Sequence, residues 1–414
     1  MAKILKLNEI SEVAEKEFPA GYTFAADVKN PDGIMLRSFN MHDYPLNDEL
    51  LAVARAGAGT NNIPIPDCTA KGIVVFNTPG ANANAVKELV LCELLLGGRK
   101  IVDAIDWVKT LKGTEGISKA VEKGKSKFVG HEITGKTLGV IGLGAIGVMV
   151  ANAAADLGMK VLGYDPYLSV QGALHLYTTT EMSDLDSLLK KADFITVHVP
   201  LTPSTEKMFN AETFAKMKEG SVLINNSRGE LVDEDAVLEA VHSGKLERYI
   251  TDFPSDKLIG EHNIICVPHL GASTPEAEDN CAAMAAKELV DYIENGNITH
   301  SVNYPDVASP RSSVCRLTIM HANVEGAISK ITTLLSANNI NIANIIDKSK
   351  GDRAYMLLDL DTKPSDELVG ETKEVHWGAR ARIFNRNFFH LLFFHPPPGG
   401  EFFMRTVQKS RNVL

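Results

Sequence analysis

Hydrophobic positions in the first 95 residues fall in short runs separated by polar or glycine-rich breaks. The runs at 33–36, 51–56 and 72–76 have the length of buried strands, and helix-length stretches lie between them. Strands that alternate with helices are typical of a parallel sheet. A longer stretch with helical spacing follows at 83–107, and the polar interval 109–130, rich in Lys and Gly, is expected to cross between two lobes.

A second series of apolar runs begins at Lys136. The strands that it predicts lie at 137–141, 160–164, 194–199, 221–225 and 264–267. Strands in this order, with helices between them, indicate a doubly wound parallel sheet. Helical spacing then covers 275–294 and stops before Gly296, a residue that tolerates the positive φ of a helix C-terminus.

The pattern changes again after a linker at Tyr304-Pro305. It predicts a strand at 316–320, a helix at 326–337, and strands at 341–348 and 354–359. These elements indicate a small α+β module that spans 314–370. No second helix or closing strand is evident after Gly370, so we expect the module to be incomplete.

The last 44 residues, 371–414, differ in composition from the rest. They contain seven of the 16 Phe residues, and 7 basic against 3 acidic residues give this segment a charge of +4. An apolar cluster at 388–395 is an aggregation hazard if exposed. We interpret the segment as an anomalous tail from a shifted reading frame or an incorrect gene end. A tail that binds a partner or touches a membrane is the alternative.

Composition limits the possible functions. A chain of 414 residues that is 44% hydrophobic and 23% charged is ordinary for a folded globular protein. The net charge of −10 argues against nucleic acid as the main partner. No apolar run is long enough to span a bilayer, and the first seven residues are expected to form a strand rather than a secretion signal. Five widely spaced Cys residues without a Cys-x-x-Cys pair predict reduced thiols, a cytoplasmic location and no metal site.

A glycine-rich motif connects the predicted strand 137–141 to a helix. Gly142 permits a tight turn, Gly144 lets the backbone approach a pyrophosphate, and Gly147 permits close packing of the helix on the strand. The phosphates would lie at the helix N-terminus. The cofactor site predicted from this loop comprises Gly142, Gly144, Ala145, Ile146 and Gly147.

Asp165 strengthens the glycine motif. It follows the next predicted strand, 23 residues after Gly142, where a carboxylate binds the ribose hydroxyls of a dinucleotide. A carboxylate there would repel the additional phosphate of NADP, so the sequence predicts NAD as the cofactor. The alternative is a glycine-rich turn with an unrelated surface aspartate.

Three further residues have the chemistry that oxidation of a hydroxy acid needs. Arg228 and His269 each follow a predicted strand, where open α/β sheets bind ligands. The guanidinium of Arg228 can hold a carboxylate through two hydrogen bonds. The imidazole of His269 can accept the hydroxyl proton, and Asp256 could hydrogen-bond the imidazolium. Taken singly, the alternatives are a surface ion pair, a structural loop histidine and a solvated loop acid. Asp252 is a candidate for the nicotinamide amide, or a turn cap.

The order of these motifs resembles that of the D-isomer-specific 2-hydroxyacid dehydrogenase family. The segments that carry the resemblance are 55–62, 77–83, 142–147, 227–229 and 268–274, within residues 1–305. The resemblance implies a Rossmann cofactor lobe at 96–272. It also implies a flavodoxin-like substrate lobe that is made of residues 1–95 and returns at 273–305.

The resemblance also implies an activity. Within the family, the chain is similar to the enzymes that use NAD to oxidise 3-phospho-D-glycerate to 3-phosphooxypyruvate, the first step of L-serine biosynthesis. A homodimer or homotetramer is expected. Reduction of glyoxylate, hydroxypyruvate or another D-2-hydroxyacid is one alternative. A protein that binds NAD as a sensor, without catalysis, is the other.

Site residues can be carried over from the family by position. Arg37 matches a position that can meet the substrate phosphate, and its alternative is an ion pair at the rim. The other residues that would contact substrate are Arg55, Gly57, Ala58, Gly59 and Asn82. Those that would border the cofactor are Val199, Pro200, Asn226, Ser227, Arg228 and Asp252, with a plain turn as the alternative for Pro200.

One position departs from the family pattern. The family commonly has a glutamate as the partner of the catalytic histidine, five residues after the position of Asp252, and this chain has Lys257 there. A deletion of one residue in the loop would place Asp256 in that role. Aspartate is one methylene shorter than glutamate, so a loosened pair would lower activity without affecting the fold.

The module at 314–370 resembles an ACT regulatory domain. In related enzymes such a domain can bind serine as a feedback inhibitor at a subunit interface. His321, Asn323 and Asn341 match the positions that contact an effector, so serine is a possible ligand. Glu325 stands where the family usually has a proline. Turn and cap chemistry is the alternative for the three polar residues.

Overall fold

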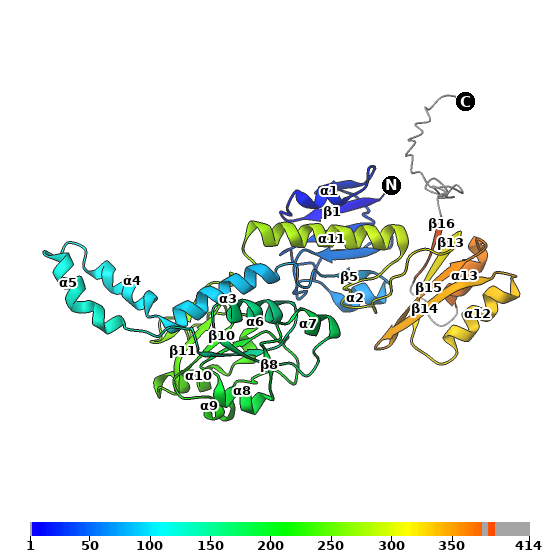
Figure 1. Ribbon diagram of the computed structural model, residues 1–414. Helices are drawn as coiled ribbons and strands as arrows, with labels where there is room; N and C mark the ends of the chain where they lie inside the picture. Colours follow the sequence, from blue (N-terminus) through cyan, green and yellow to red (C-terminus); the bar gives the residue numbers. More distant parts are fainter. Residues whose placement is uncertain (1, 375–379, 386–414) are drawn as a thin grey trace, which may run out of the picture.

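The computed structural model describes residues 2–374 and 380–385. Within these residues the chain forms two α/β lobes, each with a parallel sheet, and a smaller module with an antiparallel sheet (Figure 1). The predicted fold class is confirmed. None of the helices in the described part combines the length and the apolar composition that crossing a membrane requires.

The first lobe contains a parallel five-stranded sheet in the order β2-β1-β3-β4-β5. This is the flavodoxin-like order. The strands are β1 (Lys3–Leu7), β2 (Thr23–Ala25), β3 (Gly33–Leu36), β4 (Ala52–Arg55) and β5 (Val74–Phe76), and the short helices are α1 (Val13–Glu17) and α2 (Ile65–Ala70).

Both faces of this sheet are covered, and for that reason its strands are continuous apolar runs rather than alternating ones. In β3, Met35 packs into the core on the face of helix α11 (Pro275–Asn295). Ile34 and Leu36 pack into a separate core on the opposite face. Helix α11 comes from the far end of the chain and crosses the lobe (Figure 1).

The second lobe contains a parallel seven-stranded sheet in the order β12-β11-β10-β9-β6-β7-β8. Its strands are β6 (Thr137–Ile141), β7 (Lys160–Tyr164), β8 (Glu181–Met182), β9 (Phe194–Val197), β10 (Ser221–Asn225), β11 (Leu246–Thr251) and β12 (Ile264–Cys266). Its helices are α6 (Ala145–Asp156), α7 (Val170–His175), α8 (Leu185–Lys191), α9 (Ala211–Lys216), the 3-10 turn η2 (Gly229–Leu231) and α10 (Glu234–His242). The strand order reverses between β6 and β9, which is where such sheets bind ligands.

The stretch predicted as one helix at 83–107 is two helices, and that prediction was wrong. Helix α3 (Ala83–Gly98) ends at Arg99, which has extended backbone angles of φ −125 and ψ 132, and α4 (Ile101–Thr110) follows. The expected polar crossover at 109–130 contains α5 (Ile117–Gly124) and a 3-10 turn, η1 (Lys125–Phe128). Helices α4 and α5 project away from the rest of the molecule (Figure 1).

The third module is complete in topology, contrary to expectation. Its elements are β13 (Cys315–Ala322), α12 (Ala327–Ala337), β14 (Ile342–Lys350), β15 (Arg353–Leu360), α13 (Asp366–Glu374) and β16 (Arg380–Asn385). The antiparallel sheet has the order β14-β15-β13-β16, which is the split β-α-β-β-α-β arrangement. The second helix and the closing strand were not predicted from the sequence, because α13 is short and mostly polar. The predictions for 386–414, which include the cluster at 388–395, lie outside the described residues.

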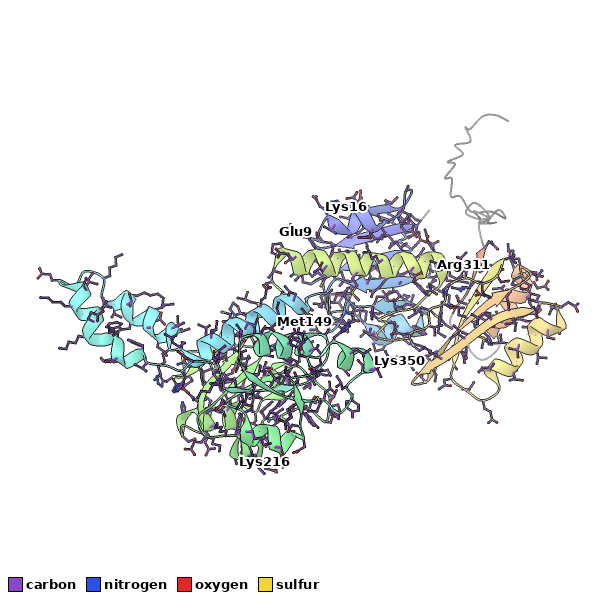
Figure 2. The ribbon with its side chains drawn as sticks, viewed as in Figure 1. Glu9, Lys16, Met149, Lys216, Arg311 and Lys350 are labelled. Atoms are coloured by element: carbon purple, nitrogen blue, oxygen red, sulfur yellow. The ribbon has the colours of Figure 1, made fainter. Side chains whose placement is uncertain are left out.

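Strand β16 explains how the module is attached. Ala381 and Ile383 face the core of the module, whereas Arg380 and Arg382 face the first lobe. Arg380 donates to the carbonyl oxygens of Asp48 and Leu50, and Arg382 lies over the ring of Tyr292 in α11 at 5.0 Å. Lys350, labelled in Figure 2, donates to the carbonyl oxygen of Ser301 at 3.0 Å. The module is therefore docked on the first lobe through cations and carbonyl groups, and also through a shared apolar core that includes Met320, Tyr355 and Leu357.

Candidate active site

A cleft of about 900 Å³ lies between the two lobes, at the carboxyl ends of their strands. Both lobes contribute to its lining. The residues predicted for the site that line it are Arg37, Arg55, Gly57, Ala58, Gly59, Asn82, Gly144, Ala145, Ile146, Val199, Pro200, Asn226, Ser227, Arg228, Asp252 and His269. Gly142, Gly147, Asp165 and Asp256 are not among its lining residues.

Gly142 and Gly147 shape the loop from behind. Gly142 has a φ of +92, and a Cβ atom there would lie 2.6 Å from the carbonyl oxygen of His198. A Cβ atom on Gly147 would lie 1.9 Å from the carbonyl oxygen of Gly142. These positions therefore need glycine, since β6, the turn and α6 could not otherwise approach so closely. A Cβ on Gly144, in contrast, would meet no protein atom within 4 Å.

The geometry of this loop fits NAD. Helix α6 begins at Ala145, and its N-cap residue, Gly144, has no side chain that could cap it. The first N–H groups and the helix dipole can therefore bind a pyrophosphate. Asp165 follows β7, and its carboxylate accepts hydrogen bonds from the N–H groups of Leu143 and Tyr167, both at 2.8 Å. Each carboxylate oxygen has a further lone pair for a ribose hydroxyl. The donors and the acceptor of a dinucleotide site are thus present.

His269 and Arg228 face the cleft from two neighbouring loops. His269 follows β12, its backbone N–H donates to the carbonyl oxygen of Asp252 at 3.0 Å, and its ring lies 4.8 Å from the ring of Phe253. Arg228 follows β10 and donates to the carbonyl oxygen of Ser227 at 2.6 Å. Both side chains are exposed in the cleft, where a substrate can reach them.

The acid whose charge interacts with His269 in the structure is Asp252, whereas Asp256, the expected partner, does not line the cleft. Asp256 is exposed in the turn after Phe253 and does not line the cleft. Asp252 is 1% exposed. Burial raises the pKa of Asp252 above its ordinary value, while the charges of His269 and Arg228 act in the opposite direction. Asp252, at the end of β11, is therefore the carboxylate whose charge acts together with that of His269.

Three arginines gather at the substrate side of the cleft. The guanidinium of Arg55 donates to the carbonyl oxygen of Arg37 at 3.0 Å, and Arg37 pairs with Glu278 of α11 at 2.5 Å. Burial lowers the pKa of Arg55, and the neighbouring charges of Arg37 and Arg228 lower it further. Mutual repulsion of this kind indicates a site built for an anionic ligand.

The sequence analysis missed two polar residues, one that lies behind the cleft and one that lines it. Glu93 lies within the apolar run of α3, and its carboxylate accepts a hydrogen bond from Asn226 at 2.6 Å. An acid in an apolar helix was a signal that could have found it. His198 lines the cleft, and burial lowers its pKa to about 4. It is therefore a neutral imidazole, and its Nε2 pairs with the hydroxyl group of Thr196 at 3.0 Å.

The three residues proposed to bind an effector do not form one site within the chain. His321 pairs with Asp347 at 3.0 Å, and Asn323 donates to the carbonyl oxygen of Gly351 at 3.1 Å. Asn341 lies at the opposite end of the sheet, beside Asp361. Strands β13 and β14 both pair with β15, and their registers place Asn323 and Asn341 near opposite ends of that strand.

Comparison with known proteins agrees with this geometry. Residues 94–271 match the family model described as the NAD binding domain of the D-isomer specific 2-hydroxyacid dehydrogenases. The D-3-phosphoglycerate dehydrogenase of Haemophilus influenzae is 34% identical over 350 residues, which cover 81% of each chain. The chain belongs to the D-isomer-specific 2-hydroxyacid dehydrogenase family.

Two further relatives are also named as phosphoglycerate dehydrogenases, and the structure of one of them contains NAD+. The D-3-phosphoglycerate dehydrogenase of Synechocystis is 37% identical over 325 residues, which cover 74% of this chain but 56% of that protein. The NAD+-bound 3-phosphoglycerate dehydrogenase of Entamoeba histolytica is 27% identical with a TM-score of 0.56, over 73% of this chain and 98% of that one. The predictions of an oxidoreductase and of NAD as its cofactor are confirmed by these matches.

Proposed function

We propose that this protein oxidises 3-phospho-D-glycerate to 3-phosphooxypyruvate with NAD, the first step of L-serine biosynthesis. The observation that carries the proposal is the group of three arginines, Arg37, Arg55 and Arg228, at one end of the cleft. A substrate with both a carboxylate and a phosphate would relieve their mutual repulsion. Several relatives with the corresponding name support the same substrate.

The chain supplies binding and proton transfer. Bound NAD+ supplies the acceptor for the hydride. Arg228 holds the substrate carboxylate and stabilises the charge that develops on the reacting oxygen. His269 accepts the proton of the hydroxyl group at its imidazole. Asp252, buried beside it, stabilises the imidazolium that results.

The phosphate would be bound at the rim of the substrate lobe. Arg37 is half-exposed and is held by Glu278, so an incoming phosphate can compete for a guanidinium that already faces the cleft. Arg55, fixed by its bond to the Arg37 carbonyl oxygen, adds a second positive charge. An unphosphorylated acid would leave Arg37 with Glu278 alone.

Steady-state rates with 3-phospho-D-glycerate, D-glycerate, D-lactate and glycolate test the proposal. We expect the phosphorylated acid to have the highest kcat/KM. A preference of tenfold or more for an unphosphorylated acid would favour a general D-2-hydroxyacid reductase. Binding of NADH without turnover of any of these acids would favour a sensor.

We also propose that residues 1–95 and 273–305 form the substrate lobe and 96–272 the cofactor lobe. The packing of α11 against α1 and β4 supports the return of the chain into the first lobe.

A homodimer through the projecting helices is part of the proposal. Helix α4 has no buried residue, and Ile101, Ile105 and Val108 are 41%, 52% and 50% exposed. The ring of Trp107 packs on Phe128, so the pair of helices holds its own shape while presenting these apolar side chains outward. An exposed apolar face of this kind usually marks an interface. Sedimentation equilibrium would test it, and a monomer at micromolar concentration would contradict it.

Regulation by serine is proposed for the third module, on its β-α-β-β-α-β topology. Because Asn341 lies away from His321 and Asn323 in one chain, a site that uses all three would need a second subunit. Inhibition by serine is the test, and a rate unchanged at millimolar serine would contradict it. The five free Cys residues support a reducing, cytoplasmic location.

A further inference from the structure

Glu93 has no role in the mechanism above, although it lies beside the site. It is 1% exposed, and its Oε2 atom accepts a hydrogen bond from Nδ2 of Asn226 at 2.6 Å. Its Oε1 atom is buried without a partner among the described residues, as are Oδ1 of Asn226 and Oδ1 of Asp252. The end of the sheet therefore holds two buried carboxyl groups and one amide with few donors to satisfy them.

Such a cluster cannot easily carry two negative charges. Burial raises the pKa of Glu93 to about 8, the bond from Asn226 acts in the opposite direction, and the charge of Asp252 raises it further. Asp252 is also raised by burial, but the positive charges of His269 and Arg228 favour its ionised form. Near neutral pH the proton therefore belongs on Glu93 and the charge on Asp252.

The other charged groups around α3 do not change this assignment. The elements packed against α3 are α6, α11, β10 and β11. Arg248 of β11 forms an ion pair with Asp103 at 2.8 Å. The acids of α11 at the cleft are also paired, Glu278 with Arg37 and Asp279 with Ser11. Asp252, His269 and Arg228 remain as the groups whose charges act on the cluster.

We propose that Glu93 is a positioning residue of this site: a buried, uncharged carboxyl group that fixes the side chain of Asn226 and leaves Asp252 as the ionised carboxylate of the cluster. Asn226 lines the cleft directly before Ser227 and Arg228. Its amide nitrogen donates to Glu93, which therefore fixes this side chain at the cleft. The consequence for turnover rests on the proposed function, whereas the protonation of Glu93 does not.

The first test is the pH dependence of stability in Glu93→Gln. An unfolded glutamate titrates near 4.5 and the folded one near 8. Between these values the folded chain keeps a proton that the unfolded chain has lost, so rising pH favours unfolding of the unmutated protein. The stabilising contribution is complete below the unfolded pKa and is lost as pH rises toward the folded one. Glutamine has no such proton.

The difference in stability between the unmutated protein and Glu93→Gln should therefore change with pH. The unfolding constant of the unmutated protein, divided by that of Glu93→Gln, should rise by up to about tenfold per pH unit between pH 5 and 8. Glu88→Gln, an exposed acid on the same helix, is the matched control and should show a constant ratio. A constant ratio for Glu93→Gln as well would overturn the proposal.

The second test is the pH profile of kcat/KM. At pH 7 Glu93→Gln should match the unmutated enzyme within about twofold, because an amide can replace a protonated carboxyl group. Above pH 8 ionised Glu93 would add a negative charge beside Asp252, so the variant should exceed the unmutated enzyme, by about tenfold at pH 9.5. Superimposed profiles over this range would contradict the proposal.

Glu93→Ala separates positioning from charge. Removing the acceptor frees Asn226, so the Kd for NADH should rise by about tenfold while the chain stays folded. An unchanged Kd would contradict the positioning role. If the unmutated protein turns over no hydroxy acid, the proposed function fails, but NADH binding and the pH-dependent unfolding still decide the role of Glu93.

Discussion

The two walls of the cleft differ in how their ionisable groups are placed. On the wall of the cofactor lobe, burial shifts the pKa values of His198 and Asp252, and it also shifts that of Glu93, which lies behind this wall in helix α3 and holds Asn226. On the wall of the substrate lobe, Arg37 is half-exposed and Arg55 lies near it. The two cations repel each other, and a bound anion would relieve this repulsion. The difference indicates that proton chemistry is set on one wall and substrate choice on the other.

The largest effect is expected at His269, on the wall of the cofactor lobe. Replacement His269→Ala removes the group that accepts the hydroxyl proton, and kcat should fall by about 10³-fold. The Kd for NADH, measured by fluorescence, should stay within about twofold. A variant that kept a tenth of the activity would show that another group takes the proton.

The next effect separates the two aspartates near His269. Asp252→Asn should lower kcat/KM by about 10²-fold, because the imidazolium loses its neighbouring charge. Burial raises the pKa of Asp252, so the rate of the unmutated enzyme should fall with acid at a higher pH than an exposed aspartate would give. Asp256→Asn is the control, exposed and outside the cleft, and should change neither rate nor profile. Equal losses in both variants would restore a role for Asp256.

A smaller effect is expected at Arg37, on the wall of the substrate lobe. Arg37→Ala should lower kcat/KM for 3-phospho-D-glycerate by about tenfold, since one charged hydrogen-bonding partner of the phosphate is lost. The rate with D-glycerate, which has no phosphate, should stay unchanged in the same variant. An equal loss with both substrates would mean that Arg37 supports the fold or the carboxylate instead.

The smallest effect concerns cofactor choice. Asp165→Ala removes the acceptor for the ribose hydroxyls, so the Kd for NADH should rise by about fivefold. The Kd for NADPH should fall or stay constant, because the repelling charge is gone. Isothermal titration with both nucleotides checks the ratio. An unchanged preference would place the selection elsewhere.

Much of the site could be predicted because its signals are local. The glycines at 142, 144 and 147 and the carboxylate at 165 are required by one turn, one helix start and one strand end, all within a single β-α-β unit. Arg228 and His269 follow apolar strands, and parallel strands bring their carboxyl ends to one edge. Periodicity and turn chemistry are sufficient for such positions.

Other features depended on distant packing. The closing strand β16 gains its place from the ladder with β13 and from the carbonyl groups that Arg380 reaches across the chain. Its own six residues carry little preference for a strand at a particular place.

The two doubly wound sheets, the NAD loop and the residues at the strand ends could be predicted from the amino-acid sequence, because they follow from short-range patterns. Two features could be found only in the folded chain: the charge of Asp252, rather than that of Asp256, interacts with His269, and Glu93 of a distant helix accepts a hydrogen bond from Asn226. Local patterns do not show which of two nearby aspartates is buried: Asp252 is 1% exposed, whereas Asp256 lies in an exposed turn. Burial, which sets the charge of these acids, is a property of the assembled lobes.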